Sequence, residues 1–335
     1  MNNPDFALSE TVRHALTPDE GLALAEAVSG FPELALSNCK EVPPSALREL
    51  RTKLSADKRL TGLIRFLGNQ LSLGHDELSG LAIVSSLPLQ DLLLDHPVVA
   101  TALTALIGTP FKMCLRYPAW QKLETKLDCE VHRFGGTGHQ PFHIDGVNVE
   151  IPPDYVCLAC VRSDPMGGGL STLSNLQKAL AVLPLEDRTF FEQEIFEEGK
   201  FFDLYGVGQE KRPFAVIGSA VEGFHLLRFT GKILPGMDRA HPHFAPFKRF
   251  SDILESQRLE MMLEPGDLLV FQQRKFAHGR TSLGPGQDRL DISKRRYLRQ
   301  GFIRDPRSWR GASPASLPRP LVNPMPVGQR AVPAS

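Results

Sequence analysis

Two short stretches, far apart in the chain, carry residue types that bind a transition metal. His143 and Asp145 lie in the first, which runs Gln140-Pro-Phe-His-Ile-Asp-Gly146, and His278 lies in the second, Phe276-Ala-His-Gly-Arg-Thr281. Two imidazoles and one carboxylate form the ligand set that holds a non-haem Fe(II) on one face and leaves its other positions open. We therefore take these three residues as candidate metal ligands and as the candidate catalytic centre.

The spacing of the first pair favours an extended strand. Alternate side chains of a strand point to the same side, so His143 and Asp145 can reach one ion while Ile144 packs the opposite way. The third ligand must then come from another strand. His278 follows the apolar run 266–271, which is typical of a short strand, and we expect it at that strand's far end.

These residues belong to a longer ordered pattern. The pattern continues after His143-x-Asp145 with Gly167-Gly-Gly-Leu-Ser-Thr172, Leu263-Glu-Pro-Gly-Asp-Leu-Leu269, His278-Gly-Arg280 and Lys294-Arg-Arg-Tyr-Leu-Arg299. Between residues 80 and 305 the chain resembles the Fe(II)/2-oxoglutarate-dependent oxygenases of the taurine dioxygenase and clavaminate synthase group. The resemblance implies Fe(II) held by His143, Asp145 and His278, with 2-oxoglutarate and O2 as co-substrates.

The resemblance also assigns residues to the distal carboxylate of 2-oxoglutarate. In the family, an arginine just before an aromatic-aliphatic pair in the last core strand forms two hydrogen bonds with this carboxylate. Arg296 matches that position best, and Thr172 matches a hydroxyl that helps to hold the same group. Arg295 and Arg299 share the opposite face by strand alternation and are the alternative.

The expected substrate is a small molecule. By analogy with the clavaminate-like branch, we expect an amino acid or an amino-acid-derived natural-product intermediate, and hydroxylation as the outcome. Desaturation and cyclisation use the same iron unit and stay open. Members that bind sulfonate or carboxylate substrates place a second arginine where this chain has Gln300, which offers neutral hydrogen bonds instead. We take Gln300 as a candidate substrate-binding residue, and Arg280 as either another or a structural anchor.

Two other functions use the same residues. One is a non-catalytic jelly-roll binding protein, and the other is a zinc hydrolase with the same three ligands. A degraded site would be expected to lose at least one ligand, and a hydrolase has no need of a carboxylate anchor such as Thr172 with Arg296. The complete pattern therefore favours the oxygenase.

The composition of the chain limits the kinds of partner that we expect. Lys and Arg number 38, as do Asp and Glu, so no net charge attracts nucleic acid or an anionic membrane. No apolar run is long enough to span a bilayer, and the N-terminus lacks the pattern of a signal peptide. Five cysteines without a framework pattern indicate reduced thiols, and Cys157 and Cys160 should face opposite sides of a buried strand. We expect a cytoplasmic protein, and the oligomeric state stays open, a homo-oligomer included.

The pattern predicts a mainly β fold with flanking helices around a double-stranded β-helix, or jelly roll. We expect a helical extension at 1–75 packing on the core, an oxygenase core at 76–305 and a proline-rich tail at 306–335. Helices are expected to begin after Thr17 and at Pro44-Ser45, and to span 98–107, 173–183 and 250–262. Strands are expected at 81–84, at 214–217 with 224–229, and around Leu268 and Arg296.

Overall fold

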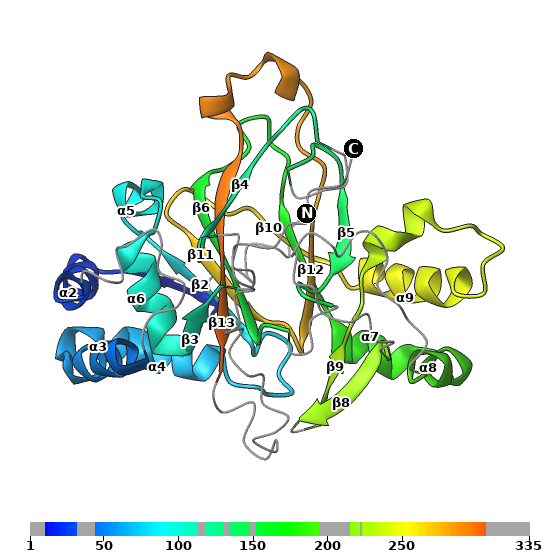
Figure 1. Cartoon of the computed structure of the whole chain (residues 1–335), viewed down its shortest axis with the longest axis horizontal. Coiled ribbons are helices and arrows are strands. Elements are labelled where there is room, and N and C mark those ends of the chain that lie inside the picture. Colours follow the sequence, from blue (N-terminus) through cyan, green and yellow to red (C-terminus); the bar gives the residue numbers. More distant parts are fainter. Residues whose placement is uncertain are drawn as a thin grey trace, which may run out of the picture.

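Two β-sheets face each other at the centre of the protein, and helices cover the outer face of each (Figure 1). The computed structural model describes residues 11–31, 44–112, 118–129, 135–147, 152–193, 215–221 and 223–305. One parallel pair, β1 with β2, joins otherwise antiparallel strand pairs, so the larger sheet is mixed. The tail predicted at 306–335 lies outside the described residues.

Seven strands form the larger sheet within the described chain. Their order is β1 (Arg13–Ala15), β2 (Leu81–Ser85), β11 (Leu268–Gln272), β6 (Tyr155–Arg162), β13 (Tyr297–Arg304) and β3 (Thr109–Phe111), with β4 (Gln121–Glu124) also on β13. The long central strand β6 shows why the sheet is buried on both faces. Cys157 and Ala159 pack toward the helices, whereas Leu158 and Cys160 pack between the sheets. The predicted separation of the two thiols is confirmed, and both are buried.

The smaller sheet carries four strands among the described residues. Their order is β10 (Leu259–Met261), β7 (Ser171–Asn175), β12 (Phe276–Arg280) and β5 (Gln140–His143). A separate hairpin pairs β8 (Ile217–Val221) with β9 (Phe224–Leu227). The predicted hairpin is therefore present, with its first strand three residues later than expected; Phe214 lies outside the described residues.

One layer of helices packs on the larger sheet. It contains α2 (Pro18–Ser29), α3 (Pro44–Ala56), η2 (Lys58–Leu60), α4 (Thr61–Gln70), α5 (Leu89–Leu93) and α6 (Val98–Ile107). The predicted start of α2 is confirmed, because Thr17 accepts a hydrogen bond from the Glu20 amide and the Glu20 carboxylate accepts one from the Thr17 amide. Gly108 ends α6 as expected. The N-terminal region also supplies the edge strand β1, which its helical pattern did not predict.

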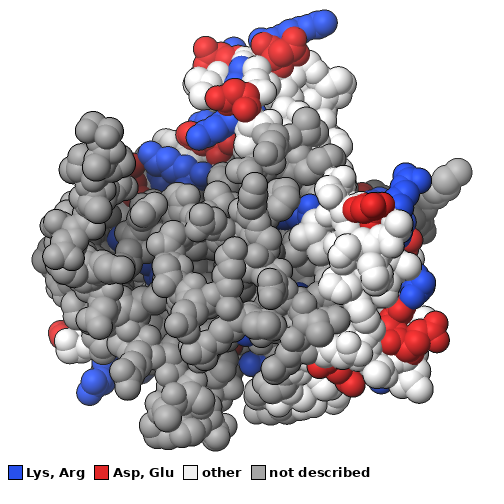
Figure 2. All heavy atoms as spheres, turned by 45° about the vertical axis from the view of Figure 1, so that its right-hand side comes forward, with Lys and Arg blue, Asp and Glu red and all other residues white. Residues whose placement is uncertain are grey.

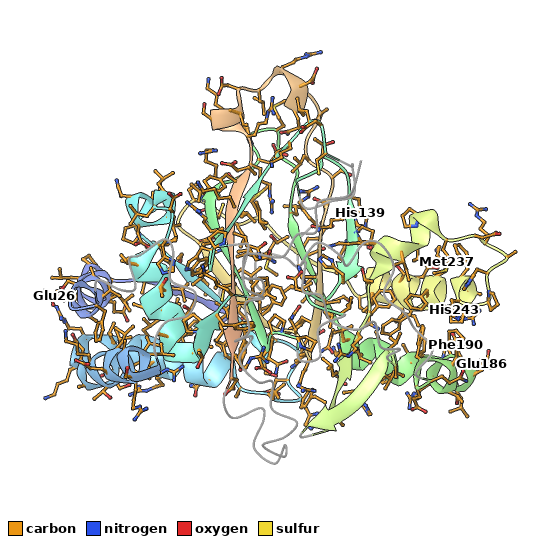
Figure 3. All side chains as sticks on the ribbon, viewed as in Figure 1. Glu26, His139, Glu186, Phe190, Met237 and His243 are labelled. Carbon is orange, nitrogen blue, oxygen red and sulfur yellow. The ribbon has the colours of Figure 1, made fainter. Side chains whose placement is uncertain are left out.

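A second layer packs on the smaller sheet. It contains α7 (Leu176–Val182), α8 (Leu185–Phe191) and α9 (Phe244–Ser256), and the 3-10 helix η4 (Gly231–Gly236) adjoins it, while η5 (Gln287–Arg289) and η6 (Ile292–Lys294) precede β13. Phe190 of α8 and His243 at the start of α9 lie side by side, with ring centroids 5.2 Å apart (Figure 3).

Two predicted helix starts were wrong. Residues 173–175 continue strand β7, since Leu173 pairs with His278 in the smaller sheet, so α7 begins at Leu176. Helix α9 spans 244–256 rather than 250–262, because Pro246 falls in its first turn, where a missing amide hydrogen costs little.

On the face in Figure 2, both basic and acidic side chains of the described residues reach the surface. None of the described helices combines the length and the apolar character that crossing a membrane requires.

Candidate active site

Two histidines from neighbouring strands meet inside the protein. The antiparallel register of β12 and β5 sets His278 directly opposite His143, and their ring centroids are 4.1 Å apart. His278 does not extend the strand that begins near residue 268. Strand β11 belongs to the larger sheet, and the chain turns at 273–275 into β12 of the smaller one. The expectation of a single strand was therefore wrong, although the third ligand does come from a second strand.

Asp145 completes the cluster from just beyond the end of β5. The strand ends at His143, so Asp145 lies in the following turn rather than in the strand. One Asp145 carboxylate oxygen lies 3.8 Å from His143 Nε2, and the other lies 3.4 Å from His278 Nε2. Ile144 packs the opposite way, against the outer helices, as the alternation predicted. Each of the three residues offers one atom that could bind a metal, these atoms lie within 4.8 Å of one another, and all three residues are buried.

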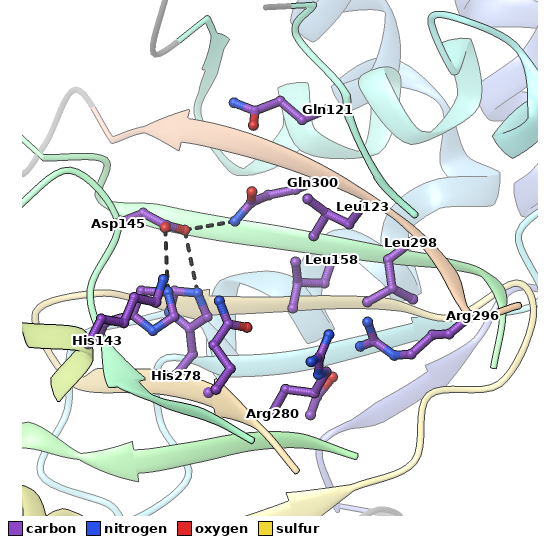
Figure 4. Close-up of a pocket in the computed structure, with 14 residues that line it drawn as sticks. Gln121, Leu123, His143, Asp145, Leu158, His278, Arg280, Arg296, Leu298 and Gln300 are labelled. Atoms are coloured by element: carbon purple, nitrogen blue, oxygen red, sulfur yellow. Dashed lines mark hydrogen bonds and ion pairs between the residues drawn. The ribbon is translucent and has the colours of Figure 1, made fainter. Parts of the chain in front are cut away.

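Two glutamines hold Asp145 in place. The side-chain oxygen Oε1 of Gln273 accepts a hydrogen bond of 2.6 Å from the Asp145 backbone amide. Gln273 Nε2 donates to the backbone carbonyls of Asp145 and Pro153 at 3.2 and 3.0 Å. Gln300 Nε2 donates to Asp145 Oδ2 at 2.7 Å (Figure 4). The sequence did not identify Gln273, because its only local signal is its place in the turn between two strands.

The histidines are in the form that a metal requires. His143 Nδ1 lies 2.9 Å from the Pro141 carbonyl, which can only accept, so Nδ1 carries the hydrogen and Nε2 keeps its lone pair. Burial holds the pKa of His143 well below its usual range and lowers the pKa of His278 to about 4. Both rings are therefore neutral at pH 7. Two neutral imidazoles and one carboxylate, with a buried His278 Nδ1 that has no hydrogen-bond partner among the described residues, fit a non-haem Fe(II).

The cluster opens into a pocket between the two sheets. Its lining combines the candidate metal ligands, three cations, neutral amides and a few apolar side chains: Gln121, Leu123, Gln140, His143, Asp145, Leu158, Ser171, Lys232, His278, Gly279, Arg280, Arg296, Leu298 and Gln300. Figure 4 shows Arg280 and Arg296 away from Asp145, toward the start of β13.

Arg296 enters this pocket from the position just before β13. It is buried, and its guanidinium donates no hydrogen bond to any described residue. Burial lowers its pKa to about 10, so it stays charged at pH 7. Arg280 lines the same pocket, with Nη2 donating to the carbonyls of Gly136 and Gly138 at 2.6 Å each. Burial, then the charge of Arg296, lowers the Arg280 pKa to about 9. Two adjacent guanidiniums favour an anion at this end of the pocket.

Neither alternative arginine lines the pocket. Arg299 lies on the outer face of β13, where Nε donates to the Leu92 carbonyl at 3.2 Å and Nη2 to the Leu94 carbonyl at 2.5 Å, near the end of α5. Arg295 Nε donates to the Leu290 carbonyl at 3.0 Å. Of the three candidates, Arg296 alone lines the pocket within the described chain.

The structure does not bring Thr172 into the pocket. Leu173 pairs with His278, so Leu173 and Ser171 share the inner face of β7, whereas Thr172 pairs with Gly279 on the outer face. A Cβ built on Gly279 would lie 2.8 Å from Thr172 Oγ1, which agrees with that placement. The pocket is lined by Ser171 instead. Thr172 is therefore absent from the described pocket lining, because neighbouring residues of a strand face opposite sides; its contact with 2-oxoglutarate stays a prediction.

Lys232 is a pocket residue that the sequence analysis missed. It lies in η4, and burial lowers its pKa to about 8, although the charge of Asp145 acts in the opposite direction. A lone lysine between Gly231 and Ile233 carries no motif, so only the folded chain identifies it.

Comparison with known proteins places this geometry in a family. The model of the family "Taurine catabolism dioxygenase TauD, TfdA family" matches residues 130–297. L-lysine 3-hydroxylase of Catenulispora acidiphila is 25% identical over 266 residues, which cover 72% of this chain and 70% of that protein. Clavaminate synthase 2 of Streptomyces clavuligerus is 26% identical over 175 residues, half of each chain.

Solved structures share the fold. Asparagine oxygenase in complex with Fe(II), 2S,3S-3-hydroxyasparagine and succinate is 19% identical, with a TM-score of 0.68 over 91% of this chain and 98% of that one. The non-haem iron oxygenase OrfP in complex with Fe and alpha-ketoglutaric acid is 19% identical, with a TM-score of 0.63 over the same shares. The match to the family model covers half of the chain, and the protein belongs to the TauD/TfdA dioxygenase family.

Proposed function

We propose that the protein is an Fe(II)/2-oxoglutarate-dependent oxygenase that hydroxylates an amino acid or an amino-acid derivative. The observation that carries this proposal is one pocket with the His143, Asp145 and His278 cluster beside the uncommitted guanidinium of Arg296. Two facing sheets with the site between them support a double-stranded β-helix core.

The candidate metal ligands and their neighbours have distinct roles in this proposal. His143, Asp145 and His278 hold the metal, and Gln300 and Gln273 fix the orientation of the Asp145 carboxylate and backbone. Arg296 binds the distal carboxylate of 2-oxoglutarate, and the Ser171 hydroxyl offers that carboxylate one further hydrogen bond. When bound, Fe(II) and 2-oxoglutarate supply the oxidising power for O2-dependent attack on a C–H bond.

The rest of the lining shapes the substrate's surroundings. Leu123, Leu158 and Leu298 form an apolar wall and restrict water near the metal-binding cluster. Gln121 and Gln140 offer amide donors and acceptors for a polar substrate. The names of the relatives, a lysine hydroxylase and an asparagine oxygenase, support an amino acid as the substrate class and hydroxylation as the outcome.

The direct test is an anaerobic titration of the purified protein with Fe(II) and then 2-oxoglutarate, monitored by the visible metal-to-ligand charge-transfer band. We expect the band in wild type, its loss in His143→Ala, and its retention in His243→Ala, which alters the histidine just before α9 that packs on Phe190. Addition of a chelator should remove the band. A folded, metal-loaded wild type without the band would contradict the proposal and favour a binding protein or a zinc hydrolase.

A further inference from the structure

Lys232 brings a positive charge into the pocket that the metal ligands and the 2-oxoglutarate anchor leave unused. Its side chain lines the pocket, and among the described residues its ammonium group makes neither a hydrogen bond nor an ion pair. Lys232 is only partly buried, but a cation without a partner in a pocket that is partly shielded from water favours an anion as its ligand.

The position of Lys232 separates it from the arginines. Thr230, two residues earlier, forms an isolated bridge with His143, and η4 packs on β5. Gly231 permits this packing, since a Cβ there would lie 3.1 Å from Pro141 Cβ. Lys232 is therefore held next to β5, the strand that carries His143. An anion bound by Lys232 would lie beside the metal-binding cluster, where a substrate must bind.

The charges of the pocket define what remains for the substrate. The described lining holds three cations, Lys232, Arg280 and Arg296, and one acid, Asp145, which serves as a metal ligand. In the proposed function Arg296 binds the distal carboxylate of 2-oxoglutarate, and Arg280 already donates to the backbone carbonyls of Gly136, Gly138 and Thr281. The Lys232 charge is left for the substrate, and no second carboxylate in the described lining awaits a basic side chain.

We propose that Lys232 binds a carboxylate of the substrate, and that the substrate is a neutral or acidic amino acid rather than a basic one. This inference rests on the proposed function and narrows it. The side-chain amide of Gln300 is committed to Asp145, so it does not hold a substrate carboxylate. Lys232 supplies the cation for that carboxylate from η4. The amides of Gln121 and Gln140 remain for a neutral polar group.

The experiment uses the full-length protein loaded anaerobically with Fe(II) and 2-oxoglutarate. Substrate binding is followed by the shift of the charge-transfer band, and succinate release is measured separately. The probes are L-asparagine, L-glutamine, L-leucine and L-glutamate, the amides of L-leucine and L-glutamine, and L-lysine and L-arginine. The variants are Lys232→Met, Lys232→Arg and the matched control Lys248→Met, which removes an exposed lysine of α9.

In wild type and Lys248→Met, we expect one of the neutral or acidic amino acids with a free carboxylate to bind tightest. The amide of that amino acid should bind about 10- to 100-fold more weakly, which is the loss typical of one charge-assisted hydrogen bond. Lys232→Met should weaken the binding of the free acid by a similar factor and leave the binding of the amide unchanged. The dissociation constant of 2-oxoglutarate should stay within about twofold of the wild-type value, a difference small against that loss. Lys232→Arg should restore the preference for the acid.

Three results would overturn the inference. The first is tightest binding of L-lysine or L-arginine by wild type, or no response to any probe by a wild type that forms the band. The second is an unchanged acid-to-amide ratio in Lys232→Met. The third is loss of the charge-transfer band in folded Lys232→Met, which would assign Lys232 to the co-substrate. Absence of the band in wild type itself is a different result, because it removes the oxygenase function.

Discussion

Replacement of Arg296 by leucine should specifically weaken the binding of 2-oxoglutarate. Arg296 is buried, points into the pocket and makes no hydrogen bond to the described protein, so its guanidinium is free to bind the co-substrate. Leucine keeps most of the apolar bulk against Gly169, whose ideal Cβ would lie 2.8 Å from Arg296 Cδ. The substitution therefore removes a charge and its donors while largely preserving the packing.

The size of the effect follows from the contacts available. Hydrogen bonds to charged groups contribute about 1.5–3 kcal/mol each, so a bidentate pair is worth about 3–5 kcal/mol, or 10²- to 10³-fold and more in affinity. Arg280 remains in the variant and retains a positive charge close by, although its Nη2 is held by the carbonyls of Gly136 and Gly138. We therefore expect the lower end of that range, about a 100-fold rise in the dissociation constant.

The assay compares 2-oxoglutarate with 2-oxopentanoate, which keeps the keto acid and lacks the distal carboxylate. Dissociation constants come from the anaerobic charge-transfer titration. Wild type should discriminate between the two by about 100-fold, and Arg296→Leu by less than about fivefold, since the lost carboxylate no longer has its partner. Arg295→Leu, next in the chain but bonded to the Leu290 carbonyl, is the control and should discriminate like wild type.

An Arg296→Leu variant that still prefers 2-oxoglutarate by the wild-type factor would refute this reasoning. Loss of the preference in Arg295→Leu would do the same, because it would mean that the face assignment of β13 is wrong.

Two further predictions concern single side chains. Ser171→Ala should raise the dissociation constant of 2-oxoglutarate by about 2- to 10-fold, the value of one neutral hydrogen bond, whereas Thr172→Val should leave it unchanged. A larger effect of Thr172→Val than of Ser171→Ala would mean that Thr172 contacts 2-oxoglutarate. Burial, aided by the charges of Lys112 and Arg299, lowers the pKa of His96 to about 4 from 6.5. The unfolded chain therefore binds more protons between pH 6.5 and 4, and stability falls as the pH falls through that window, by at most about 1.4 kcal/mol per pH unit for this group. Urea unfolding at pH 7 and pH 5 should show a smaller loss in His96→Gln than in wild type, and equal losses would contradict the assignment.

Much of the local structure follows from the sequence. Thr17 with Pro18 and Glu20 sets the start of α2, and Gly108 ends α6, because these signals act through neighbouring backbone groups. Alternation along the strand placed Arg296 on the face opposite Arg295 and Arg299, and the resemblance favoured Arg296 as the residue that faces the pocket, which the structure shows it lining.

Residue types together with their ordered spacing likewise pointed to the candidate metal-binding cluster. His143, Asp145 and His278 are recognisable as a ligand set, and the structure brings their side chains together from two strands of one sheet and the turn that follows one of them. Their identity depends on chemistry that the residues carry with them wherever the chain places them.

Other features were decided by tertiary structure. Which of Ser171 and Thr172 faces the pocket depends on the register of β7 against β12, where a slip of one residue reverses the face. Contacts between distant segments also decide three other features. They take the chain from β11 to β12 in the opposite sheet, they bring Gln273 into hydrogen bonds with Asp145, and they place Lys232 beside β5. A local sequence pattern does not reveal such contacts, so the residues that adapt this pocket to its substrate can be identified only from the folded structure.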